Sequence, residues 1–363
     1  MTPQSPEPAA AVLRAGRWVR VVAWVIVIAA AAVFAWANRR DIPDAWHAAR
    51  TANPWWLLAG LGWTALYLVG QAGMYAGAWR AVGLQGSMRE LLQPSLAGGA
   101  LNIVSKSAGM GGLAVFLARA KRVGEPAGLV TTAYTGVVVI AHATFTLTLA
   151  VVFVVMWVDG HVTRLELLAG AIFGVYVIAQ VAVLAGALWS RAAVRRVYRT
   201  AGVAAHVGRR LLGREHGAFV PNDEAADELF EAVSALRRAP GRLAGALAWG
   251  MAVELAGAGL LWSVLQALGE PASPVVALSG YAMTVLFSTV GVLPGGLGFA
   301  EASLGAMLRS YGVSLPGTAA AVVLFRIGEA WIPLAAGLVA LRLSGRERRD
   351  AAAPAFIEEG EGS

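Results

Sequence analysis

The chain has 363 residues, of which 58% are hydrophobic and only 14% are charged. Soluble domains are about 45–50% apolar and about 25% charged, so this composition excludes a soluble globule. The chain contains no Cys, which excludes disulfides, thiolate metal sites and a Cys nucleophile. The formal net charge is +7. We nevertheless expect no nucleic-acid partner, because the Arg residues cluster beside apolar blocks, as they do in cytoplasmic loops.

Apolar blocks of roughly 20 residues recur along the chain, long enough to cross a hydrocarbon core of about 30 Å. They predict an all-α, polytopic helical membrane protein. The blocks cover about residues 18–37, 54–79, 91–117, 128–158, 165–189, 243–268, 274–293 and 316–341. The first block resembles a signal peptide that ends in Ala35-Trp36-Ala37. The reading as an uncleaved first span is favoured, because more spans follow it.

Basic loops set the predicted orientation. Residues 191–214 carry seven Arg and no acid, and basic residues also cluster at 119–122 and 346–349. The positive-inside rule places these loops and both termini in the cytoplasm. We expect one membrane domain over 15–345, flanked by disordered tails at 1–14 and 346–363. Within it, 191–240 is a basic amphipathic segment on the inner leaflet.

Two blocks do not resemble simple spans. Residues 91–117 have basic residues at both ends and a Gly-rich middle that holds Asn102 and Lys106. Residues 274–311 are broken by Pro294-Gly295-Gly296-Leu297-Gly298. Broken backbone at membrane depth requires protein or a wet cavity around it. We therefore predict two re-entrant helical hairpins in addition to six full spans, with eight plain spans as the alternative.

The order of these elements repeats. Residues 18–158 give span, span, hairpin and span, and residues 165–343 give the same order with the hairpin entering from the other side. Gly111-Gly112-Leu113 echoes Gly295-Gly296-Leu297. Such a pattern is typical of an inverted repeat, in which paired broken helices indicate a binding site near the midplane.

Familiar catalytic and nucleotide-binding signatures are absent, and the five His residues are scattered. We therefore expect no enzyme activity, no metal and no cofactor. Ionisable residues at membrane depth are costly and face a cavity or a partner. Two interpretations stay open for each: a structural ion pair, such as Arg326 with Glu329 or Glu301, or a polar cavity for a charged headgroup. The candidates are Lys106, Glu254, Glu301, Arg326 and Glu329, with His142 as a neutral possibility.

A family resemblance rests on residues 293–301, Leu-Pro-Gly-Gly-Leu-Gly-Phe-Ala-Glu, followed by Phe325-Arg326 and Trp331-Ile332-Pro333. The sequence resembles the flippase-like, lysylphosphatidylglycerol synthase transmembrane-domain family over about residues 15–345. The matching positions are Pro294, Gly295, Gly296, Gly298, Glu301 and Arg326. We expect a stand-alone member without the soluble aminoacyl-transfer domain of the synthase members. The sequence has Ser105-Lys106-Ser107 where a Pro and Arg-Gly stretch is more usual.

The resemblance implies a multi-pass protein of the bacterial inner membrane that binds or translocates a lipid. We expect a flippase or headgroup transporter for an anionic phospholipid or lipid-linked glycan. The alternative is a membrane component of a glycolipid, hopanoid or polyprenyl-phosphate pathway, and a homo-oligomer is left open. The expected substrate-binding residues are Lys106, Arg326, Asn102, Gly295, Gly296 and Glu301, and Glu254 and Glu329 are expected to serve in coupling or charge balance.

Overall fold

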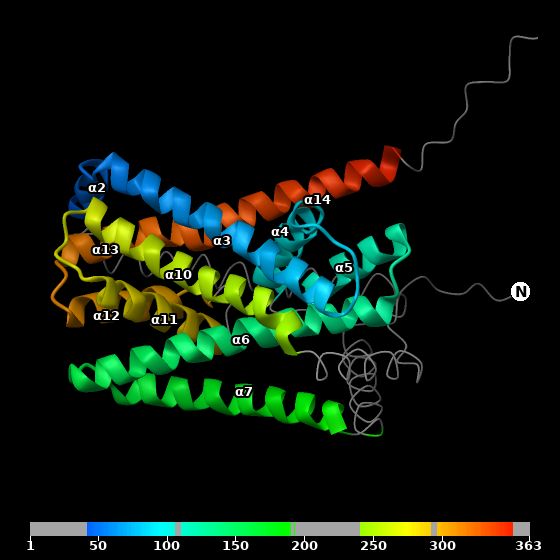
Figure 1. Cartoon of the computed structure of the whole chain (residues 1–363). Coiled ribbons are helices and arrows are strands. Elements are labelled where there is room, and N and C mark those ends of the chain that lie inside the picture. The colour runs from blue at the N-terminus through cyan, green and yellow to red at the C-terminus, as the bar shows by residue number, and fades with distance from the viewer. Residues whose placement is uncertain (1–41, 106–109, 190–191, 193–239, 292–295, 351–363) are drawn as a thin grey trace, which may run out of the picture.

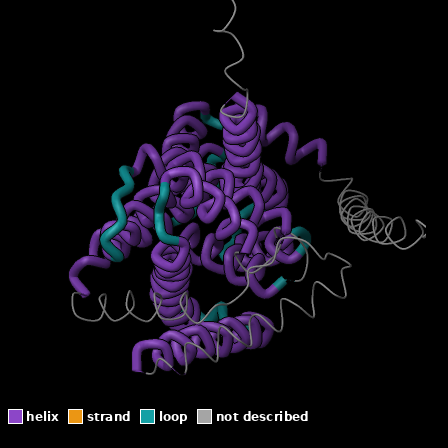
Figure 2. The backbone as a smooth tube through the Cα atoms, turned by 90° about the vertical axis from the view of Figure 1, so that its right-hand side faces the viewer, coloured by secondary structure: helices purple, strands orange, loops and turns teal. Residues whose placement is uncertain are grey.

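The computed structural model describes residues 42–105, 110–189, 192, 240–291 and 296–350. Every regular element in these ranges is a helix, and short loops join the helices (Figure 2). The all-α prediction is therefore confirmed for the described part of the chain. The expected first span 18–37, the tail 1–14 and nearly all of segment 191–240 lie outside the described residues.

Long helices form the body of the molecule and run roughly along one direction (Figure 1). Among the described residues, four helical stretches are long and apolar enough to cross a membrane: Pro54–Ala81, Ala127–Val158, Ala244–Ala267 and Leu315–Leu343. The first three are α3, α6 and α10. The fourth contains α13 (Leu315–Arg326), the single-turn element η3 (Ile327–Trp331) and most of α14 (Ile332–Asp350). The expected span at 165–189 forms the helix α7 (Arg164–Trp189), which is not one of the four.

Each of the two unusual apolar blocks folds as a pair of shorter helices. The block 91–117 consists of α4 (Met88–Ser105) and α5 (Met110–Val123), which pack against each other. The block 274–311 consists of α11 (Pro274–Val290) and α12 (Phe299–Ser310), which also pack against each other. Figure 1 shows that the two pairs lie toward opposite ends of the bundle. The short elements α2 (Ile42–Arg50) and η1 (Pro240–Leu243) complete the described fold.

Glycines allow α3 and α10 to approach closely along their lengths. A Cβ atom on Gly77 would lie 2.7 Å from the backbone nitrogen of Ala246, and one on Gly73 would lie 2.4 Å from the ring of Trp249. Small residues commonly bring membrane helices into such contact, because close backbones gain van der Waals packing. This central pair supports the elements that surround the cavity described below.

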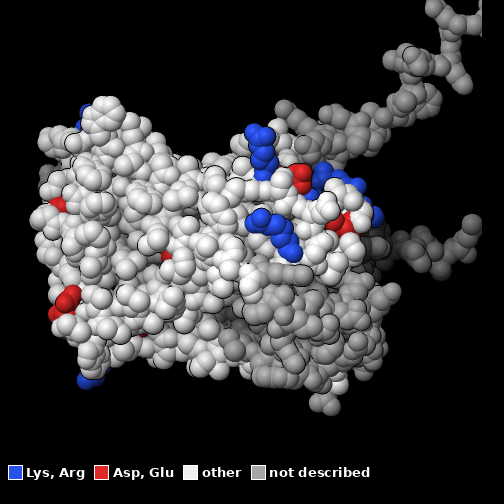
Figure 3. All heavy atoms as spheres, viewed as in Figure 1, with Lys and Arg blue, Asp and Glu red and all other residues white. Residues whose placement is uncertain are grey.

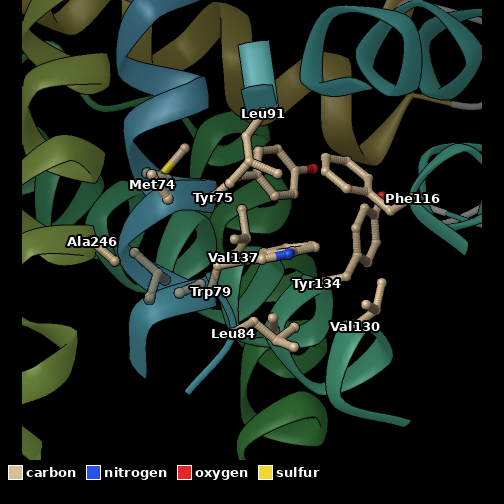
Figure 4. Close-up of a cluster of buried hydrophobic side chains, with 14 of the residues drawn as sticks. Met74, Tyr75, Trp79, Leu84, Leu91, Phe116, Val130, Tyr134, Val137 and Ala246 are labelled. Carbon is tan, nitrogen blue, oxygen red and sulfur yellow. The ribbon is translucent and has the colours of Figure 1, made fainter. Parts of the chain in front are cut away.

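An aromatic cluster anchors the α4–α5 pair to the bundle (Figure 4). The ring centroids of Tyr75 on α3 and Phe116 on α5 lie 4.4 Å apart, and Trp79 lies 5.1 Å from Phe116. Tyr134 on α6 contributes a third aromatic ring against Phe116. Aromatic pairs at these separations contribute roughly 0.5–1.5 kcal/mol each beyond burial. The cluster therefore fixes one hairpin against two long helices.

On the face seen in Figure 3, charged side chains are sparse along the middle of the bundle and gather mainly toward its ends. Large apolar side chains such as Val154 on α6, Ile178 on α7 and Leu255 on α10 are exposed. Continuous exposed apolar surface of this kind is typical of a membrane-facing exterior. One end carries basic residues in the last turns of α3 and α5, namely Arg80, Lys121 and Arg122.

Candidate functional site

A polar cavity of about 210 Å³ lies inside the apolar bundle. Its walls come from α3, α6, α7, α10, α11 and η3. The contributing positions fall near the middle of the long helices, for example Tyr67 in α3, His142 in α6 and Glu329 in the last span. The polar residues that line the cavity are Tyr67, Gln71, His142, Thr144, Glu254, Tyr281, Ser288, Thr289 and Glu329.

Glu254 is the most buried carboxylate of this lining. Its residue exposure is 6%, and its Oε2 atom has no hydrogen-bond partner among the described residues. The Tyr281 hydroxyl from α11 lies next to the same carboxyl group. Gly257, one turn after Glu254, makes room for the Tyr281 ring, because a Cβ there would lie 2.1 Å from it. The sequence indicated Glu254, but not the tyrosine that accompanies it.

Glu329 joins the cavity to a buried ion-pair network. The Arg326 Nη1 atom lies 2.7 Å from Glu329 Oε2, and Arg326 Nε lies 2.7 Å from Glu301 Oε1. The Arg326 side chain is only 7% exposed. Arg326 therefore forms an ion pair with each of the two carboxylates that the structural interpretation named. Arg326 is not among the cavity-lining residues, so its expected role as a direct headgroup ligand stays a prediction.

A local change of helix type positions Glu329. Residues Ile327–Trp331 form a π-helical turn, in which the backbone N–H of Ile332 donates to the carbonyl of Ile327. Pro333 follows and has no backbone N–H to continue the regular α-helical pattern. Single π-turns inside helices occur frequently at functional sites. Here the turn brings Glu329 to the cavity while Arg326, before the turn, contacts α12.

The start of α12 is occupied by its own carboxylate. The Gly298 backbone N–H donates to Glu301 Oε2 at 2.7 Å, and the other oxygen of Glu301 binds Arg326. Glu301 was expected to bind substrate, and in the structure its carboxylate is engaged at this helix start; substrate binding by Glu301 stays a prediction. Gly296 is buried with a φ of +68°, and a Cβ atom on it would lie 2.4 Å from Ser288 Cα. Pro294 and Gly295 lie outside the described residues.

Asn102 holds the other hairpin together rather than facing the cavity. Its Oδ1 accepts a hydrogen bond from the Gly112 backbone N–H at 2.8 Å, and its Nδ2 donates to the Tyr134 hydroxyl at 3.2 Å. These bonds join α4, α5 and α6. Lys106, which the sequence analysis places in the same hairpin, lies outside the described residues. Substrate binding by Asn102 and Lys106 therefore stays a prediction.

A second cavity of about 660 Å³ lies at the base of the α4–α5 hairpin. Its wall includes Arg119, whose Nη1 atom binds both oxygens of Glu125 at 2.8 Å. Because it lies beside the α4–α5 pair rather than near the middle of the long helices, this cavity is a weaker candidate than the central one.

Most of the neutral polar groups of the central cavity were not among the residues expected from the sequence. Tyr67 and Gln71 sit in the middle of a predicted span, where a polar side chain is itself a signal of an internal face. Ser288 and Thr289 precede the hairpin break and carry no such distinct signal, because hydroxyl side chains are common in membrane helices.

The sequence matches the model of a known protein family. The family model described as "Lysylphosphatidylglycerol synthase TM region" matches residues 21–337. This range includes every described residue of the central cavity. A search of curated proteins finds no match.

Proposed function

The chain belongs to the lysylphosphatidylglycerol synthase TM-region family, and on that premise we propose that it is a lipid flippase or lipid-headgroup transporter. The observation that carries the proposal is the polar cavity at the middle of an apolar helix bundle. A headgroup that crosses a bilayer must leave water at the midplane, where an unsolvated polar group is costly. The hydroxyl, amide and carboxyl groups of the cavity would replace part of that hydration.

The proposed membrane arrangement has six full spans and two re-entrant hairpins in an inverted repeat. Support comes from the two helix pairs, which lie toward opposite ends of the bundle (Figure 1). Further support comes from α3 and α10, the corresponding helices of the two proposed halves, which pack together at the centre. Inverted repeats of this kind bind substrate where the broken helices of both halves meet.

We propose that the protein lies in the bacterial inner membrane with both termini in the cytoplasm. The positive-inside rule supports this orientation, because basic residues gather at the end of the bundle where α3 and α5 finish (Figure 3). The hairpin α4–α5 would then enter from the cytoplasm, and α11–α12 would enter from the opposite side.

The proposed cargo is an anionic phospholipid or a lipid-linked glycan, and the proposed activity is transport without catalysis. Lys106 and the α11–α12 hairpin tip remain the proposed contacts for a phosphate. Arg326 also stays a proposed headgroup ligand, and its ion pairs with Glu301 and Glu329 support a structural role beside that one.

The test is the leaflet exposure of fluorescent phosphatidylglycerol in proteoliposomes. We expect the wild-type protein to move the lipid faster than protein-free vesicles do. Thr289→Trp should slow the movement, because Thr289 lines the cavity and a Trp side chain would fill much of its volume. Thr131→Trp is the matched control: both hydroxyls bond the carbonyl four residues earlier, but Thr131 does not line the cavity. Equal rates for the two variants would argue against the cavity as the lipid path.

A further inference from the structure

Glu254 combines deep burial with an unused hydrogen-bonding atom. It is 6% exposed, its Oε2 atom has no partner among the described residues, and its side chain lines the central cavity. An ionised carboxylate at membrane depth is costly unless it pairs with a cation or carries a proton. Whether the Glu254 carboxyl group is ionised or protonated therefore affects the charge of a ligand that the cavity can bind.

The described wall of the cavity supplies no cation to Glu254. None of its lining residues is Lys or Arg. The titratable groups around it are Tyr67 from α3, His142 from α6, Tyr281 from α11 and Glu329 from η3. Arg326, the nearby cation of the last span, already binds both Glu329 and Glu301 at 2.7 Å. Two carboxylates thus face one small cavity, and only Glu329 has an Arg partner among the described residues.

We propose that Glu254 is a proton-binding site and that its proton moves together with an anionic headgroup. This inference rests on the proposed function. When the cavity is open to one side, the Glu254 carboxylate takes a proton from a hydronium ion: an O–H bond of hydronium breaks, the O–H bond of the acid forms, and water is released. The neutral acid no longer repels an anionic headgroup. When the cavity opens to the other side, the O–H bond breaks and the proton returns to water as the headgroup leaves. In this proposal the Tyr281 hydroxyl, which lies next to the carboxyl group, would donate to the ionised form and accept from the protonated form.

The other titratable groups around Glu254 are the alternatives from which the experiment has to distinguish it. Tyrosine hydroxyls titrate near pH 10, so Tyr67 and Tyr281 stay neutral at the pH values used. Imidazole titrates near pH 6.5 and is the natural competitor, so His142 must be tested beside Glu254. Glu329 already pairs with Arg326 at 2.7 Å, so Glu254 is the cavity carboxylate to which the described residues provide no Arg partner.

The experiment measures movement of fluorescent phosphatidylglycerol in proteoliposomes with and without an imposed pH gradient. We expect wild-type protein to move the lipid faster away from the acidic side. Glu254→Gln should make the rates equal with and without the gradient, because the amide cannot exchange a proton. Glu166→Gln, at the surface and outside the cavity, and His142→Gln should keep the gradient response. A gradient response that survives in Glu254→Gln, or one that disappears in His142→Gln alone, overturns the proposal.

A second readout does not depend on transport. Infrared difference spectra of the purified protein in nanodiscs, taken between acidic and alkaline pH, should contain one component of the protonated-carboxyl C=O band that is lost in Glu254→Gln and kept in Glu166→Gln. If this band is assigned to Glu254 but no lipid moves, the proton site stands and the proposed transport function fails. If lipid moves but the band is unchanged in Glu254→Gln, transport stands and the proton site is overturned.

Discussion

The guanidinium of Arg326 donates a hydrogen bond to the carboxylate of Glu329 three residues later, with 2.7 Å between Nη1 and Oε2. This hydrogen bond spans the start of the π-turn and connects the start of α12 to the lining of the central cavity. Arg326 fixes the start of α12 through Glu301, whereas Glu329 faces the central cavity. Because Arg326 pairs with both carboxylates, we expect a displacement of Glu301 at the start of α12 to alter the position of Glu329 in the cavity.

Removal of this cation should destabilise the protein strongly. Arg326→Ala leaves Glu301 and Glu329 without their shared partner, and breaking a buried pair in this way costs about 3–5 kcal/mol. Arg326→Lys should recover part of the loss, because an ammonium keeps the charge but lacks the fork of two donors. Thermal unfolding in detergent measures both. The double variant Arg326→Ala/Glu301→Gln should be more stable than Arg326→Ala alone, and equal stability would contradict the shared-cation account.

The α3–α10 interface should not tolerate a methyl group at Gly77. The nearest atom is the Ala246 backbone nitrogen at 2.7 Å, which cannot rotate away as a flexible side chain can. We expect Gly77→Ala to lower the unfolding free energy by about 1–3 kcal/mol, the usual cost of overpacking. Gly62→Ala on the same helix is the control, because nothing lies within 4 Å of its added Cβ. A denaturation series in mild detergent that shows no difference between the two would refute the close packing.

Asn102 should stabilise the α4–α5 hairpin. Asn102→Ala removes the acceptor for the Gly112 N–H and the donor to Tyr134, and such buried losses cost about 1–3 kcal/mol. Tyr134→Phe removes the second of these bonds together with the hydroxyl's interactions with Tyr75 and Leu113, but it leaves the Gly112 N–H paired with Asn102. Hydrogen exchange of the Gly112 amide provides the local measurement. We expect faster exchange in Asn102→Ala and near wild-type exchange in Tyr134→Phe.

The proposed topology makes a labelling prediction that the natural chain allows directly, because it contains no Cys. Gln85→Cys and Lys121→Cys lie at exposed positions where the α4–α5 hairpin begins and ends, and both should react with an impermeant maleimide from the cytoplasmic side. Pro271→Cys, exposed between α10 and α11, should react from the opposite side. Labelling of Gln85→Cys and Lys121→Cys from different sides would show that residues 91–117 form one plain span.

The apolar blocks of the sequence determined the helices of this protein because backbone groups in lipid have to be satisfied within a helix. The expected spans 54–79 and 128–158 correspond to α3 and α6 within two residues at each end. The Gly-rich and Pro-Gly breaks likewise predicted that blocks 91–117 and 274–311 would not be single helices. The helix α14, however, continues to Asp350, past the expected boundary at residue 345, since charged residues outside the apolar block still form helix.

Only the tertiary structure decided which polar groups meet. The pairing of Arg326 with Glu329 was open to prediction, because residues three apart share a helix face. The simultaneous bond to Glu301 depends on how α12 packs beside the last span, which no local spacing encodes. The approach of Glu254, Tyr281 and Glu329 to one cavity depends in the same way on packing between helices distant in sequence. The sequence specifies which polar side chains are present. Whether they line one cavity depends on the distances between their helices, and these distances are set only when the small and large side chains of the helices pack against one another.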